Sequence, residues 1–273
     1  MVITDKKVSE NRFLFLIDFS VESLQSLTYL INFVKVTGGQ IELLYAFEKM
    51  NFIDEANAQS VLLDLKKKEH KIERKLIALK EIIEVENIPV KTGYTFGDLE
   101  IEVNLKQDQL KDNLVIVIDS ESEGTIKKSS KFLINSYLGS VLIINSTSKL
   151  ENGNSIILSG DSDSLHQSDL RLPSFLCEKL NVPLIILEST KRNESKSFIY
   201  PVINQIDVFY NPISESNTFL DLKKYVTNNS IILLSICREN TNKSLLKKFF
   251  NTNKTLMEVV NTINTPLLIL NNK

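Results

Sequence analysis

Two aspartates stand at corresponding places in the chain, where their carboxylates could contact a ligand. Asp18 follows the apolar run 13–17, and Asp161 comes after the apolar run 155–159. In both places a helical pattern and a second apolar run come next. Ligands of parallel α/β sheets bind past the carboxyl ends of the strands, so both aspartates mark expected ligand positions. Each could equally do no more than cap the helix that follows.

Other residues that could do chemistry give weaker signals. The acidic stretch 119–123 could hold a metal through carboxylate oxygens, but it lacks the spacing of a calcium loop, and a solvated turn is the preferred interpretation. Cys177 and Cys237 are expected to be buried, inert thiols. His70 and His166 have no Cys or His neighbour at metal-ligand spacing.

The sequence contains no nucleophile elbow, no metalloprotease helix motif and no complete phosphate loop. We therefore expect no catalytic activity, no metal and no cofactor. The lysines at 66–68 favour a solvated helix face over a nucleic-acid patch, because Glu69 and Glu73 interleave with them.

Composition narrows the class of protein further. The chain has 273 residues, 42% hydrophobic and 24% charged, which is typical of a globular protein of about two domains. The formal net charge of -2 gives no electrostatic case for nucleic acid or an anionic membrane as a general partner. No apolar run approaches the ~18 residues of a membrane helix, and the N-terminus lacks the apolar core of a signal peptide. We expect a cytoplasmic protein, and two cysteines are compatible with a reducing compartment.

The elements that would position the aspartates alternate between strands and helices. In the first half, strands are expected near 13–17, 40–46, 88–94, 114–118 and 141–144, and helices near 20–37, 55–86, 98–108 and 126–137. Ser20 should cap the first helix, Gly38-Gly39 should end it, and Leu24, Leu27, Leu30, Ile31 and Val34 should form its apolar face. The stripe of the long helix is expected at Leu62, Leu65, Ile72, Leu76, Leu79 and Ile83.

The second half repeats this order with shorter parts. Strands are expected near 155–159, 183–187, 205–210, 230–235 and 267–270, and helices near 165–180, 217–228 and 254–263. The polar stretch 146–154, which contains Gly153, is the best linker candidate. The sequence therefore predicts an α/β protein of two tandem doubly wound, Rossmann-like domains, 1–147 and 152–273. Each should have a five-stranded parallel sheet, and the second should be trimmed.

The chain resembles the universal stress proteins. The resemblance rests on Asp18-Phe19-Ser20 after the first strand, on Gly97-Asp98 after the third strand, and on the closing apolar strand of each half. It implies an adenine nucleotide alpha hydrolase-like fold over nearly the whole chain, and a role in stress or growth arrest. It also implies that the last strands, 141–145 and 267–270, could meet in an internal pseudo-dimer. A further homodimer is possible.

In members of that family that bind ATP, the aspartate contacts the nucleoside, and glycine-rich segments after the fourth strand hold the phosphates. The resemblance thus assigns Asp18 to the nucleoside and places Ala46 near the adenine. Asp119 and Ser122 stand where paired glycines would lie, and Ser129-Ser130 where a Gly-Ser pair would be. In the second half, Ser235 and Arg238 replace the paired glycines. The ligand-binding candidates are Asp18, Phe19, Ser20, Ala46, Asp119, Ser122, Ser129, Ser130, Asp161 and Arg238.

The size of the repulsion between like charges favours one of two functional hypotheses. Two like charges ~4 Å apart cost about 4 kcal/mol at an effective dielectric constant near 20, so the acids at 119–123 should oppose a triphosphate. The first hypothesis is a stress-type binding or regulatory protein that does not hold ATP tightly and takes an unknown small ligand or a protein partner. The alternative is an adenine-nucleotide sensor that uses Asp18 and Asp161, with slow hydrolysis.

Overall fold

The structure is a computed structural model. It describes residues 11–47, 58–110, 114–119, 121, 132–134, 137–150, 153–159, 167–190, 208–214, 224–226, 228–237 and 265–270.

Ten strands and four helices are bounded within this part of the chain. The strands are β1 (Arg12–Ile17), β2 (Gln40–Ala46), β3 (Val90–Thr95), β4 (Leu114–Asp119), β5 (Ser140–Ile144), β6 (Ser155–Ser159), β7 (Leu184–Thr190), β8 (Val208–Ser214), β9 (Ile231–Cys237) and β10 (Leu267–Leu270). The helices are α1 (Val21–Thr37), α2 (Ala58–Glu84), α3 (Leu99–Leu110) and α5 (Gln167–Leu180). All ten expected strands are present, with ends that differ by a few residues. The helices expected at 126–137, 217–228 and 254–263 lie largely or wholly outside the described residues.

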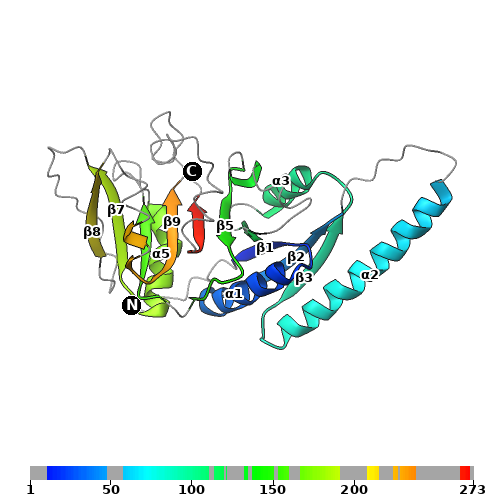
Figure 1. Ribbon diagram of the computed structural model, residues 1–273, viewed down its shortest axis with the longest axis horizontal. Coiled ribbons are helices and arrows are strands. Elements are labelled where there is room, and N and C mark those ends of the chain that lie inside the picture. Colours follow the sequence, from blue (N-terminus) through cyan, green and yellow to red (C-terminus); the bar gives the residue numbers. More distant parts are fainter. Residues whose placement is uncertain are drawn as a thin grey trace, which may run out of the picture.

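All ten strands form one sheet, in the order β3-β2-β1-β4-β5-β10-β9-β6-β7-β8. Read outward from the centre, both halves have the same order: last, fourth, first, second and third strand. Every neighbouring pair is parallel except β5 and β10, which run antiparallel with Leu268 opposite Leu142. The two expected five-stranded sheets are therefore joined edge to edge, through the two strands that the resemblance pointed to (Figure 1).

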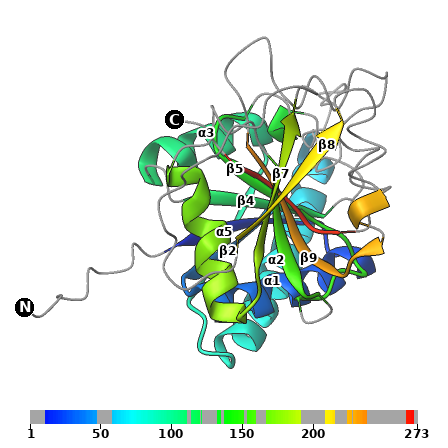
Figure 2. The same ribbon diagram turned by 90° about the vertical axis from the view of Figure 1, so that its left-hand side faces the viewer.

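Helices cover both faces of the sheet, which explains why the strands are continuous apolar runs. One core contains residues of α1, α2 and α5, including Phe33, Leu76 and Leu176. The other lies under α3 and includes Leu99 and Val103. Figure 2 shows α3 on one side of the sheet and α1 and α5 on the other. Both cores contain residues from both halves, so each face is one continuous apolar layer.

Helix α1 begins and ends where the sequence predicts. The side chain of Ser20 accepts a hydrogen bond from the backbone N–H of Ser23, which satisfies one free donor of the first turn. Gly38 ends the helix at φ 68°, a conformation that favours glycine. The expected apolar face is wrong at Leu24, which is 38% exposed, and it omitted the fully buried Phe33.

Helix α2 packs on the sheet only along its later turns. Ile72, Leu76 and Ile83 are buried as expected, whereas Leu62 is 50% exposed and does not belong to the core. In Figure 1 the helix lies along the outer side of the first half, next to β3.

The junction between the halves is a tight, specific turn. The side-chain carbonyl of Asn145 accepts hydrogen bonds from the hydroxyls of Thr147 (3.0 Å) and Ser148 (2.7 Å). Leu150 is buried in the core shared with α1 and α5, so the linker is partly built into the fold. The division into domains at 147 and 152 stays a prediction, as does the trimming of the second half, whose residues 191–207 lie outside the description.

Candidate functional site at the carboxyl ends of β1 and β4

The sheet of the first half reverses its order beside β1. The chain leaves β1 through α1 and returns as β2 on one side, while β4 pairs with β1 on the other side. Ligands of doubly wound folds bind at such a switch point, outside the carboxyl ends of the strands. The turn Asp18-Phe19-Ser20 follows β1 directly, and Asp119 is the last residue of β4. The fold thus places these four sequence candidates at neighbouring strand ends.

Asp18 is half-buried, and one of its carboxylate oxygens is used inside the turn. Its Oδ1 accepts hydrogen bonds from the backbone N–H (2.9 Å) and the hydroxyl (2.7 Å) of Ser20. Ser20 in turn caps α1, so Asp18 supports the cap rather than providing it. Within the described residues Oδ2 of Asp18 has no hydrogen-bond partner. Oδ1 is therefore bonded within the turn, and Oδ2 can accept a hydrogen bond from a ligand.

Phe19 holds an unusual backbone conformation. Its φ is 62°, in the left-handed region that bulky L residues rarely adopt. Such a conformation costs ~1–3 kcal/mol and persists only where the surroundings enforce it. Here the ring of Phe19 contacts Tyr45 of β2, with centroids 5.7 Å apart, and the ammonium of Lys75 of α2 lies 4.8 Å above it. The turn is therefore held between β2 and α2.

Asp119 is buried at 1% exposure, at the position that the resemblance led us to compare with a phosphate-binding glycine. Its Oδ2 accepts a hydrogen bond from the hydroxyl of Ser26 on α1, and its Oδ1 accepts one from the backbone N–H of Glu121 at 2.6 Å. The carboxylate thus ties the end of β4 to α1. Its expected position next to a bound phosphate stays a prediction.

Ala46 is the last residue of β2 and is nearly buried, at 9% exposure. It faces α3 and packs in the core with Leu99 and Val103. Its side chain therefore contributes to packing beneath the strand ends.

An aromatic group that the sequence analysis did not single out lies at the ends of β1, β2 and β3. It consists of Phe19, Tyr45, Phe47, Tyr94 and Phe96. Phe47 is central: its ring centroid lies 4.9 Å from Tyr45, 5.8 Å from Tyr94 and 4.4 Å from Phe96. The spacing of two residues between Tyr45 and Phe47, and between Tyr94 and Phe96, was the available signal, since residues i and i+2 share a face of a strand.

Helix α2 closes over this aromatic group through a polar contact as well. The hydroxyl of Tyr94 donates a hydrogen bond to Oε1 of Glu69. The bond and the neighbouring carboxylate charges raise the pKa of Tyr94 above its usual value, so the phenol stays protonated and keeps donating.

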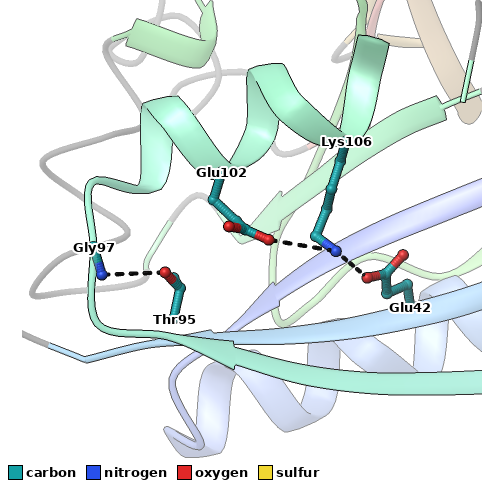
Figure 3. Close-up of polar contacts among 5 residues, drawn as sticks. All are labelled: Glu42, Thr95, Gly97, Glu102 and Lys106. Carbon is teal, nitrogen blue, oxygen red and sulfur yellow. Dashed lines mark hydrogen bonds and ion pairs between the residues drawn. The ribbon is translucent and has the colours of Figure 1, made fainter. Parts of the chain in front are cut away.

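The start of α3 completes the strand-end edge (Figure 3). Thr95 Oγ1 accepts a hydrogen bond from the N–H of Gly97 at 3.1 Å, and Asp98 Oδ1 accepts one from the N–H of Glu100 at 3.1 Å. About two turns further along α3, Lys106 Nζ lies 2.5 Å from Oε1 of Glu42 on β2 and 3.6 Å from Oε1 of Glu102. This half-buried ion pair fixes α3 to the sheet.

Five sequence candidates fall outside the described residues: Ser122, Ser129, Ser130, Asp161 and Arg238. Their roles stay predictions, as does metal binding by 119–123, of which only Asp119 and Glu121 are described. In the described part of the chain, no group of three His, Cys, Asp or Glu side chains is arranged to hold a metal ion.

The thiols of Cys177 and Cys237 are both buried, and neither forms a disulfide. Burial raises the pKa of Cys177 to about 12, so its thiol is neutral at ordinary pH and a poor nucleophile. This agrees with the inert role that we expected. His70 is paired with Glu73 at 3.6 Å on the surface of α2, and His166 is outside the description.

No protein-family model matches the chain, and no curated protein matches its sequence. Comparison with solved structures gives a clear result for the fold. A universal stress protein from Archaeoglobus fulgidus DSM 4304 superposes with a TM-score of 0.69 at 15% identity, over 97% of each chain. A protein described as a putative universal stress protein from Pseudomonas aeruginosa UCBPP-PA14 gives 0.54 at 13% identity, over 96% of this chain and 93% of that one.

A functionally unknown protein from Pseudomonas aeruginosa PAO1 gives a TM-score of 0.53 at 13% identity, over 96% of this chain and 92% of that one. The chain therefore has the fold seen in universal stress proteins, and it matches them over nearly its whole length. No helix in the described ranges combines the length and the apolar character needed to cross a membrane.

Proposed function

We propose that this chain is a binding or regulatory protein of the universal stress type, without catalytic activity. In this proposal its ligand site is the switch point at the ends of β1 and β4, and that site does not hold ATP tightly. The likeness of fold to universal stress proteins supports the type. The position of the Asp18 turn beside the end of β4 supports the location.

The observation that supports the exclusion of ATP is a group of three carboxylates at these strand ends. The buried carboxylate of Asp119 ends β4, and Asp18 and Glu121 lie at the same strand ends. A like charge ~4 Å away costs about 4 kcal/mol at an effective dielectric constant near 20, which offsets several hydrogen bonds to a triphosphate. Replacing Asp119 also disturbs α1, because its carboxylate is bonded to Ser26.

The free oxygen of Asp18 indicates what the site should prefer. A carboxylate only accepts hydrogen bonds, so a ligand should present a hydroxyl, an amide N–H or an ammonium group to it. We therefore infer a small polar ligand that is neutral or cationic. Mass spectrometry of small molecules that copurify with the native protein should detect such a compound in the wild type, and less of it in Asp18→Asn.

Titration calorimetry with Mg-ATP and with adenosine tests the proposal directly. We expect no saturation by Mg-ATP at micromolar concentrations. Adenosine, which lacks phosphates, separates charge repulsion from loss of the nucleoside contact: binding of adenosine alone would assign the exclusion to the phosphates. Micromolar binding of Mg-ATP would overturn the proposal.

The alternative of an adenine-nucleotide sensor is favoured by the strained turn at Phe19, since such backbone conformations cluster at ligand sites. It predicts a rise in melting temperature, because a ligand at 100 times its Kd stabilises by about 2.7 kcal/mol. Under this alternative Asp18→Ala abolishes the rise, and Ser23→Ala, in the first turn of α1, does not. If no nucleotide shifts the melting temperature, the sensor hypothesis fails.

A further inference from the structure

The positive charge of α2 is concentrated on one side of the helix. At ~100° per residue, five exposed cations fall within an arc of ~120°. They are Lys67, Lys68, Lys71, Arg74 and Lys75, and together they are here named the basic side of α2. Lys75 also lies over the ring of Phe19. The buried residues Ile72, Leu76 and Ile83 lie on a different side, so packing on the sheet does not require the other four cations.

The acids that interleave with the lysines in the sequence are mostly used elsewhere. Glu69 accepts a hydrogen bond from Tyr94, Glu73 pairs with His70, and Glu84 lies 3.7 Å from Lys80. Asp64 is the one acid paired with the basic side, at 3.4 Å from Lys67. Among the described residues Lys68, Lys71 and Arg74 have no carboxylate partner.

The closely spaced cations of the basic side slightly lower the stability of α2. Lys71 has like charges three or four residues away at Lys67, Lys68, Arg74 and Lys75, and each such pair destabilises a helix by a few tenths of a kcal/mol. The chain as a whole has a formal net charge of -2, so these cations are not part of a general positive surface. A bound anionic partner would offset the repulsion among these closely spaced cations.

Exposed apolar side chains continue the basic side toward the end of the helix. Ile82 is 61% exposed and Val85 is 79% exposed, and both lie within the same arc as the cations. The N–H of Val85 still bonds to the carbonyl of Glu81, so the helical turn extends to it. The surface thus has two chemical parts: two turns of cations, then an apolar end.

We propose that the basic side of α2, with Ile82 and Val85, docks an acidic segment of a partner protein that carries apolar residues at one end. The cations extend over ~12 Å, which matches two turns of an acidic helix. Nucleic acid would satisfy the cations but would leave Ile82 and Val85 unused. An interfacial membrane helix would need a much larger apolar face than these two residues supply.

The test uses fluorescence anisotropy with the full chain and a labelled peptide of Glu-Glu-Leu repeats that ends in Leu-Leu. The triple variant Lys68→Glu, Lys71→Glu, Arg74→Glu should weaken binding by at least ~10-fold, because each substitution replaces an attraction by a repulsion. The matched control is Lys149→Glu, Arg171→Glu, Lys224→Glu, which changes the net charge equally at exposed positions outside α2 and β3. It should change the affinity by less than ~2-fold.

A second variant, Ile82→Ser with Val85→Ser, distinguishes a protein partner from a nucleic acid. It should weaken the peptide by ~3-fold or more while leaving any residual binding of a poly-dT oligonucleotide unchanged. Circular dichroism and the melting temperature check that each variant folds. Equal losses in the triple variant and its control would overturn the proposal. So would an oligonucleotide or anionic phosphatidylserine vesicles that bind more tightly than the peptide and do not respond to the apolar variant.

Discussion

The hydroxyl of Ser26 on α1 donates a hydrogen bond to the buried carboxylate of Asp119 at the end of β4. The two residues are 93 positions apart in the sequence, and both are almost fully buried. The bond joins the helix that starts at the switch point to the strand that ends there. It gives Asp119 a structural role at the position that the sequence analysis compared with a phosphate-binding glycine.

Ser26→Ala should destabilise the fold by about 1–3 kcal/mol, because it removes a donor from a buried carboxylate. Urea unfolding followed by circular dichroism measures the change. Thr28→Ala is the matched control on the same helix, since Thr28 is exposed and its hydroxyl makes only a 3.4 Å contact with the carbonyl of Leu24. Equal effects of the two substitutions would show that the Ser26 bond contributes nothing.

Lys106→Met should cost about 1–2 kcal/mol, even though Met keeps most of the aliphatic stem. The substitution leaves the carboxylates of Glu42 and Glu102 close together and half-buried without their shared cation. Lys80→Met removes a more exposed pair with Glu84 and should cost less than about 0.5 kcal/mol. The comparison is made by guanidinium unfolding at low salt, and a cost at Lys106 no larger than at Lys80 would contradict the account of Figure 3.

Gly153→Ala should destabilise by at least ~2 kcal/mol, because a Cβ there would lie 2.4 Å from Cγ1 and 2.6 Å from the backbone nitrogen of Ile232. Moving that nitrogen means moving β9. Gly97→Ala is the control, since a Cβ at that position has no neighbour nearer than 3.6 Å. Thermal unfolding should show a clear loss for the first variant only, and a tolerated Gly153→Ala would mean that the junction has room.

Alkaline pH should weaken the fold through Cys177. Its pKa rises from 9.0 to about 12 on folding, so the unfolded thiol ionises first and stability falls as pH rises above about 9. Between pH 8 and 10 the loss amounts to about 1.4 kcal/mol, and below pH 8 the contribution is complete. Cys177→Ala should lose that part of the pH dependence in urea titrations. Iodoacetamide at pH 8.5 should leave the native thiol unmodified, so rapid alkylation of Cys177 in the folded protein would disprove its protection.

Much of the fold follows from local patterns. The strands are continuous apolar runs because both of their faces are covered. Ser20 fixes the start of α1 and Gly38 fixes its end, through interactions within a few residues. The helical period did not predict burial at every position, because it does not show which turns of a helix meet the rest of the fold. Leu62 lies in the predicted stripe of α2 but is 50% exposed, and Leu24 lies in that of α1 but is 38% exposed.

The candidate site was only partly predictable. The Asp18 turn follows from strand order and from the resemblance, whereas the direction of Asp119 depends on Ser26, which only the packing of α1 on β4 reveals. The interleaved acids of α2 suggested only a solvated helix face, because the sequence does not show which carboxylates are used by Tyr94, His70 and Lys80.

The central position of β10 has a consequence for how the chain is made. Strand β10 is the last strand along the chain, yet it lies between β5 and β9 in the middle of the sheet. During synthesis on the ribosome, β5 emerges long before its antiparallel partner exists. A chain made only as far as β5 therefore has an unpaired edge strand of buried apolar residues, and that edge stays open until β10 has been made.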